Sequence, residues 1–154
     1  IKTTSSGAMG ANQGRIISKR DTSVPALGYE LYVEVGETVP RFVLFDSGGN
    51  DVRVGITNVT DTNWHHLVGI RSGSNIQLYV DGRPEVNAPT ARTGSLANAS
   101  NFLISQYSPG AANRYWPGQI DDVRVYNYAL TSTQVKQLYN GGAGVRFGPN
   151  TGSP

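Results

Sequence analysis

The sequence predicts an all-β fold of short antiparallel strands, closed as a sandwich or a barrel, with one short helix near the C-terminal end. Apolar runs of strand length recur at short spacing and are separated by turn residues. The chain of 154 residues contains 19 glycines and 8 prolines, and charged residues make up only 16%. No helical segment alternates with the strands, which argues against parallel βαβ folds.

Each expected strand follows from its residue pattern. Tyr29, Leu31, Val33 and Val35 alternate with polar or aromatic residues, which predicts one face turned to a core. Residues 76–80 repeat this alternation, and the following Asp81-Gly82 pair is typical of a tight hairpin. The expected strands are residues 14–20, 28–35, 41–45, 51–57, 63–71, 76–80, 102–105 and 119–126.

A single helix is expected after Thr131. Thr131 and Gln134 form a capping-box pattern, in which each side chain bonds the backbone of the other residue. Val135, Leu138 and Tyr139 then share one face of the helix, and residues 140–142 (Asn-Gly-Gly) end it. We therefore divide the chain into one domain, residues 1–140, and a tail or linker, residues 141–154.

Composition excludes several classes of function. The formal net charge is +2, and no basic stripe with interleaved aromatics is present, which argues against nucleic-acid binding. The absence of cysteine removes disulfides, thiolate metal sites and a cysteine nucleophile. No apolar run approaches the roughly 20 residues of a membrane helix, so we expect no membrane insertion. Because the chain starts at Ile1 and not at methionine, we expect an upstream segment that was removed or omitted.

Two motifs carry a family resemblance. Residues 64–68 (WHHLV), followed by 76–82 (IQLYVDG), and residues 118–127 (GQIDDVRVYN), followed by 129–131 (ALT), occur in this order. They resemble the core of laminin-G-like, pentraxin-like domains of the concanavalin A-like group. The resemblance implies a jelly roll of two antiparallel sheets, in secreted or cell-surface proteins that bind glycans or other proteins. The family pattern opens with further strands before residues 1–4, so we expect an open sheet edge, completed by a partner chain or an upstream segment.

These features predict a non-catalytic extracellular module that binds carbohydrate or mediates adhesion, within a larger secreted or surface protein. The alternative is a structural or protein-interaction domain of a surface assembly without a glycan ligand. The loop of residues 107–116 offers Tyr107, Asn113, Arg114 and Tyr115 as ligand-binding side chains, because such groups stack on sugars or bond their hydroxyls. Trp116 is expected in the core.

Glu30 and Glu34 lie on one strand face, as do the catalytic acids of glucanases with the resembling fold. The middle position of that acid triplet is Tyr32 here, so we expect two solvent-facing glutamates and no enzyme activity. His65 and His66 point to opposite faces of a strand and cannot share one metal ion. We expect His66 to pack inward and His65, without an obvious aspartate partner, to be partly exposed.

Asp121 is the one expected metal-binding residue. Strand alternation puts it in phase with Val123 and Val125, which should face the core, while Asp122 should face outward with Arg124. An inward carboxylate needs a partner. Backbone amides could serve, and so could one structural calcium ion, since resembling glucanases have a calcium-binding aspartate at this position.

Overall fold

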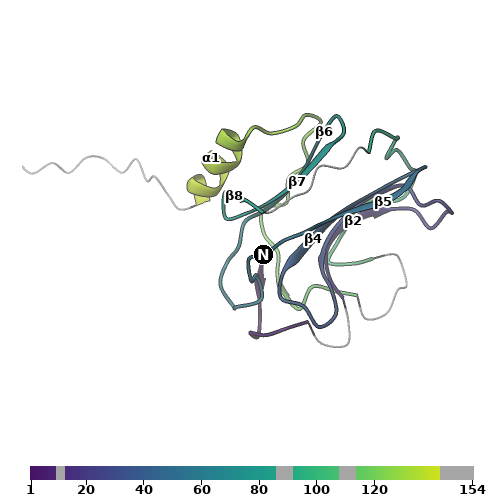
Figure 1. Cartoon of the computed structure of the whole chain (residues 1–154). Helices are drawn as coiled ribbons and strands as arrows, with labels where there is room; N and C mark the ends of the chain where they lie inside the picture. The colour runs from purple at the N-terminus through teal and green to yellow at the C-terminus, as the bar shows by residue number, and fades with distance from the viewer. Residues whose placement is uncertain (10–12, 86–91, 108–113, 143–154) are drawn as a thin grey trace, which may run out of the picture.

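The structure is a computed structural model of the chain, and it describes residues 1–9, 13–85, 92–107 and 114–142. Its described elements are almost all antiparallel strands, with one helix at the C-terminal end (Figure 1). They are β1 (Lys2–Thr3), β2 (Gly14–Arg20), β3 (Gly28–Val33), β4 (Pro40–Asp46), β5 (Gly49–Val54), β6 (Leu67–Ser72), β7 (Asn75–Val80), β8 (Arg83–Pro84), β9 (Leu103–Ile104), β10 (Gly118–Gln119) and α1 (Ser132–Gly142).

The strands form two main layers that face each other (Figure 1). One is a five-stranded sheet in the order β5-β4-β3-β2-β9, and the other is a three-stranded sheet in the order β6-β7-β8. A third ladder of only two residues per strand joins β1 to β10. The mostly β, antiparallel sandwich with one short helix confirms the predicted fold class.

The core lies between the layers, where the alternation of β3 and β7 predicts it. Leu31 and Val33 of β3 pack with Leu78 and Val80 of β7 in one buried cluster. Trp116 belongs to the same cluster and is 4% exposed, which confirms its expected packing role. Its ring lies close over the backbone of Gly14, where an added Cβ would come within 3.0 Å of the indole.

The hairpin and the helix also form as expected. Asp81 and Gly82 both have positive φ, at 50° and 72°, which the tight turn from β7 to β8 requires. At the start of α1, the amide of Gln134 donates to the hydroxyl of Thr131, and the amide of Thr131 donates to the Gln134 side chain. Val135 then buries its side chain against Ile70 on the outer side of the three-stranded sheet.

In β5, the buried side chains that alternate toward the core are charged and not apolar. Cross-strand register places Asp51 and Arg53 beside the core residues of β4, while Val54 lies on the other face and is 40% exposed. The two buried side chains pair, with the guanidinium of Arg53 bonding both carboxylate oxygens of Asp51 at 2.8 Å. Arg53 also donates to the backbone oxygen of Ile76, and this bond links the two layers.

The expected closing strand over residues 119–126 is mostly wrong for this structure. Only Gly118–Gln119 is in a ladder, and the described residues that follow are irregular up to α1. Val123 and Val125 are 38% and 64% exposed, so neither faces a packed core. The physical reason is that, in the described part of the chain, no second strand runs along residues 120–126, and an unpaired segment cannot hold strand geometry.

Candidate functional site

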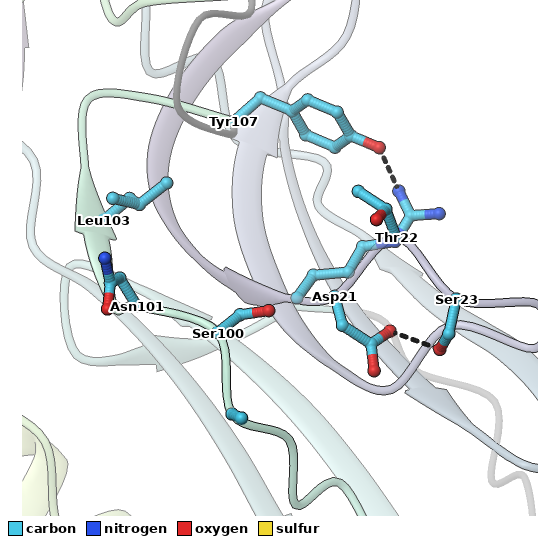
Figure 2. Close-up of a pocket in the computed structure, with 9 residues that line it drawn as sticks. Asp21, Thr22, Ser23, Ser100, Asn101, Leu103 and Tyr107 are labelled. Carbon is cyan, nitrogen blue, oxygen red and sulfur yellow. Dashed lines mark hydrogen bonds between the residues drawn. The ribbon is translucent and has the colours of Figure 1, made fainter.

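A polar pocket of about 610 Å³ lies at one end of the five-stranded sheet. Seven of its nine lining residues have side chains that can donate or accept hydrogen bonds, including carboxylate, amide, hydroxyl and guanidinium groups. Figure 2 shows Leu103, Asn101 and Ser100 lying across the opening from Thr22 and Ser23. The lining residues are Arg20, Asp21, Thr22, Ser23, Ala99, Ser100, Asn101, Leu103 and Tyr107.

Strand pairing brings the two loops of this pocket together. β2 and β9 run antiparallel, with Ser18 opposite Leu103, so the C-terminal end of β2 meets the N-terminal start of β9. Two further residues form hydrogen bonds that join the second loop to the first. The ammonium of Lys19 donates to the backbone oxygen of Ser100 at 2.7 Å, and the side-chain amide of Asn98 donates to the backbone oxygen of Leu27 at 2.9 Å.

Asp21 gives the pocket a negative charge at neutral pH. Its carboxylate accepts hydrogen bonds from the backbone amide of Leu27 and from the hydroxyl of Ser23, both at 2.8 Å. These bonds, led by that of Leu27, lower the pKa of Asp21 from its ordinary value. The exposed side chains of Thr22 and Asn101 lie across the pocket from each other (Figure 2). A ligand with several hydroxyl groups would therefore meet acceptors and donors together.

Tyr107 closes the pocket on the side of Arg20. Its hydroxyl accepts a hydrogen bond from the Arg20 guanidinium at 2.8 Å (Figure 2). The guanidinium carbons of Arg15 and Arg114 lie 5.0 and 4.5 Å from the centre of the Tyr107 ring. Cationic groups thus already lie over the Tyr107 ring, where they compete with a sugar that would stack on it.

The four side chains expected to bind a ligand are therefore distributed unevenly. Tyr107 lines the pocket. Arg114 does not line it, but its guanidinium lies over the Tyr107 ring. Tyr115 is 50% exposed and does not line the pocket. Asn113 lies outside the described residues. A binding role for these four residues stays a prediction.

The expectation of two solvent-facing glutamates is wrong for Glu30. Its side chain is 1% exposed and pairs with the guanidinium of Arg15 at 3.0 Å, and the Ser18 hydroxyl near it also contacts the backbone oxygen of Tyr107. Burial raises the pKa of Glu30, and the nearby charge of Arg15 opposes that shift. Glu34 is partly exposed and accepts a hydrogen bond from Gln13. Tyr107 lies against Arg15 and accepts a hydrogen bond from Ser18, and the strand pattern alone did not predict these neighbours.

Both histidines are partly buried, and the expectation that His65 has no aspartate partner is wrong. The imidazole of His65 lies between two aspartates, with its nitrogens 2.8 Å from carboxylate oxygens of Asp61 and Asp81. Burial acts to lower the pKa of His65, but the two aspartates outweigh it, and the net shift is upward. His66 stacks on the ring of Tyr139, and burial lowers its pKa. The spacing of Asp61 and His65, four residues apart, was a signal that could have identified the first contact.

Asp121 does not have the inward position that alternation predicts. It is exposed, and its carboxylate accepts the backbone amide of Asp122 at 2.8 Å. Among the described residues, no group of three or more histidine, aspartate or glutamate side chains is arranged to hold a metal ion. The donors around Asp121 therefore do not fit a calcium site. Asp122 pairs with Arg124 at 2.8 Å on the exposed surface, as expected.

The sequence reasoning missed most residues of the pocket, namely Arg20, Asp21, Thr22, Ser23, Ser100 and Asn101. Residues 21–23 and 98–101 are short polar runs in two loops, and each run alone is typical of an ordinary turn. Only the pairing of β2 with β9 joins them.

Comparison with known proteins gives three matches. A laminin G model described as the concanavalin A-like lectin/glucanases superfamily matches residues 2–136. C-reactive protein from Sus scrofa is 29% identical over 92 residues, which are 56% of this chain and 38% of that protein. A crystal structure of residues 221–444 of an S-layer domain-containing protein from Clostridium thermocellum aligns with a TM-score of 0.44 and 20% identity, over 90% of this chain and 66% of that chain.

This chain therefore spans well under half the length of the curated relative that it matches. Within the described residues, none of the helical structure is long and apolar enough to cross a membrane.

Proposed function

Because the chain belongs to the concanavalin A-like lectin/glucanase superfamily, we propose that it is a non-catalytic carbohydrate-binding or adhesive module. The observation that carries the proposal is the polar pocket between residues 20–23 and 99–107. Its volume of about 610 Å³ lies within the range of small-ligand sites, roughly 300–1,000 Å³. We place the module in a larger secreted or cell-surface protein.

The polar groups of the pocket favour a sugar, neutral or charged, over an apolar ligand. Asp21 is held ionised and can accept hydrogen bonds from sugar hydroxyls, while the exposed amide of Asn101 can both donate and accept. The Arg20 guanidinium adds a donor on the far side, next to Tyr107. A single shallow site with exposed polar groups is consistent with weak binding, to which repeated modules on a surface would add avidity.

A non-catalytic role is supported by the position of Glu30. A glycosidase needs two carboxyl groups that flank an accessible sugar bond, roughly 5–10 Å apart. Glu30 is buried, paired with Arg15 and bonded by the Ser18 hydroxyl at 3.1 Å. With 1% of its side chain exposed, this carboxylate is not accessible to a sugar in the structure.

The test is a glycan array followed by calorimetric titration of the glycans that bind. Asn101→Ala and Thr22→Ala should each weaken binding about 2- to 10-fold, since a lost hydrogen bond is worth about 0.5–1.5 kcal/mol. The matched control is Asn140→Ala, an exposed amide in α1 far from the pocket lining, which should leave binding unchanged.

Three outcomes would contradict the proposal. Binding that survives Asn101→Ala and Thr22→Ala but is lost in Tyr115→Ala would place the site outside the pocket. An array without any bound glycan would favour the alternative, a structural or protein-interaction domain of a surface assembly. Release of reducing sugar from a β-glucan, abolished by Glu30→Gln, would refute the non-catalytic role.

A further inference from the structure

Three positively charged guanidinium groups surround the ring of Tyr107. The guanidinium carbons of Arg114, Arg15 and Arg20 lie 4.5, 5.0 and 5.5 Å from the centre of this ring. In the described structure a carboxylate pairs with only one of these groups, where Glu30 lies 3.0 Å from Arg15. The other two cations, Arg20 and Arg114, have no ion-pair partner among the described residues.

The sequence has no acidic residue outside the described ranges that could balance these two charges. All 11 aspartates and glutamates lie within those ranges. The remaining ion pairs of the described chain use other cations, namely Arg41, Arg53, His65, Arg92 and Arg124. An excess of one charge at a concave surface raises the local concentration of ligands of the opposite charge. The charges around Tyr107 therefore indicate a site for an anion.

Arg20 is the arginine that lines the pocket. A guanidinium has five N–H donors, and those of Arg20 have one acceptor in the described structure, the hydroxyl of Tyr107 at 2.8 Å. The guanidinium carbon also lies 4.3 Å from the centre of the Phe45 ring, a contact that orients the planar group. The fork of an arginine matches two oxygens of a carboxylate or a sulfate. Arg20 thus combines a fixed orientation with unused donors at the wall of a polar cavity.

We propose, on the basis of the function proposed above, that the pocket binds an acidic glycan, a sugar whose single carboxylate or sulfate lies at the Tyr107 end. Arg20 binds this oxyanion directly. Arg114 does not line the pocket, and it attracts the oxyanion through space from its position over the Tyr107 ring. The hydroxyls of the same sugar then meet the polar side chains of the opposite loop, Ser100 and Asn101.

Asp21 limits how much negative charge the ligand can carry. Its carboxylate lies in the same pocket but is turned toward Ser23 and away from the Tyr107 hydroxyl (Figure 2). A polymer with a negative charge on every unit, such as a nucleic acid, would be repelled at this end. Sugar hydroxyls would instead donate hydrogen bonds to the carboxylate. The pocket therefore fits a sugar with one acidic group beside Arg20 and neutral hydroxyls beside Asp21.

The experiment is a calorimetric titration with disaccharides that end in glucuronate, galacturonate or mannuronate. Each acid is paired with its methyl ester, which has the same hydroxyls without the charge. A second set with one sulfate in place of the carboxylate tests the other source of an oxyanion. The variants are Arg20→Gln and Arg114→Gln, which each remove a charge, and Arg20→Lys, which keeps the charge without the fork. The matched control is Arg83→Gln, an exposed arginine of β8 that does not line the pocket.

At least one acidic disaccharide should bind the wild-type chain roughly 10- to 100-fold more tightly than its neutral counterpart, because hydrogen bonds to a charged group are strong. Added NaCl should weaken this preference. Arg20→Gln should abolish it, Arg20→Lys should reduce it, and Arg83→Gln should leave it unchanged. Arg114→Gln should reduce it about 2- to 5-fold, since a charge without direct contact contributes less.

The comparison of acid with ester needs no variant, so it decides the question even if Arg20→Gln does not fold. Equal binding of acids and esters would overturn the acidic ligand and leave glycan binding, the proposed function, in place. Binding of inorganic sulfate that Arg20→Gln abolishes, without binding of any sugar, would overturn the glycan and leave an anion site. A preference for acids that persists in Arg20→Gln would overturn the role of Arg20.

Discussion

Removing Arg15 should destabilise the fold strongly, because Glu30 would remain buried without its ion-pair partner. The two side chains are 4% and 1% exposed and lie 3.0 Å apart. Removing one member of a buried ion pair costs about 3–5 kcal/mol. In a domain of this size each kcal/mol shifts the melting temperature by about 2–4 °C, so Arg15→Met should lower it by roughly 6–20 °C at pH 7.

The deficit should depend on pH in a defined direction. Burial raises the folded-state pKa of Glu30 above its ordinary value of 4.5, and the loss of Arg15 would raise this pKa further. A carboxyl with a raised folded-state pKa stabilises the fold fully below the unfolded-state pKa, and this contribution is lost as pH rises through the folded-state pKa. The difference between wild type and Arg15→Met should therefore shrink as pH falls from 7 toward about 4.

Urea unfolding at several pH values measures both effects, with two comparison variants. Arg41→Met removes a pair with Glu37 whose side chains are 24% and 31% exposed, so it should cost less than about 1 kcal/mol. Arg15→Met combined with Glu30→Leu removes both buried charges and should recover most of the lost stability. The reasoning fails if Arg15→Met is as mild as Arg41→Met, or if its deficit does not change with pH.

Two further predictions concern His65 and Asp121. His65 has a folded-state pKa above its ordinary value of 6.5, so its stabilising contacts with Asp61 and Asp81 should weaken as pH rises through that pKa. In a pH series of unfolding curves, His65→Gln should remove this loss of stability at higher pH, and His66→Gln should retain it. The same loss in both variants would contradict the assignment of the effect to His65. Asp121→Ala and Asp122→Ala should change the melting temperature equally little, and EDTA should not change it. If calcium raised the melting temperature of the wild type and Asp121→Ala abolished that rise, Asp121 would be a calcium ligand after all.

Much of the sandwich was predictable because strand alternation and turn chemistry act locally. Leu31 and Val33 face the core, Asp81 and Gly82 adopt the left-handed turn, and Thr131 caps the helix, each for a reason visible within a few residues of sequence. These interactions do not depend on which distant segment lies opposite.

The candidate site was less predictable because its walls come from distant parts of the chain. Asp21 and Asn101 meet only because Ser18 pairs with Leu103, a contact between residues 85 positions apart in the numbering. The strand pattern predicts an exposed Glu30, because it does not reveal the ion pair with Arg15 or the bond from Ser18 that accompany its burial. Polar loops carry no periodicity that would reveal such neighbours.

The failed prediction over residues 119–126 has a different origin from the missed pocket. Its pattern is as clear as that of β7, and yet β7 is a full strand and residues 120–126 are not. The difference lies in the partners, because β7 has β6 on one side and β8 on the other, whereas no described strand pairs with residues 120–126. A strand is stabilised by ladder bonds and covered side chains as much as by its own residues. The pattern of residues 119–126 therefore predicts strand geometry that the described structure has only at Gln119, where β10 pairs with Lys2 of β1.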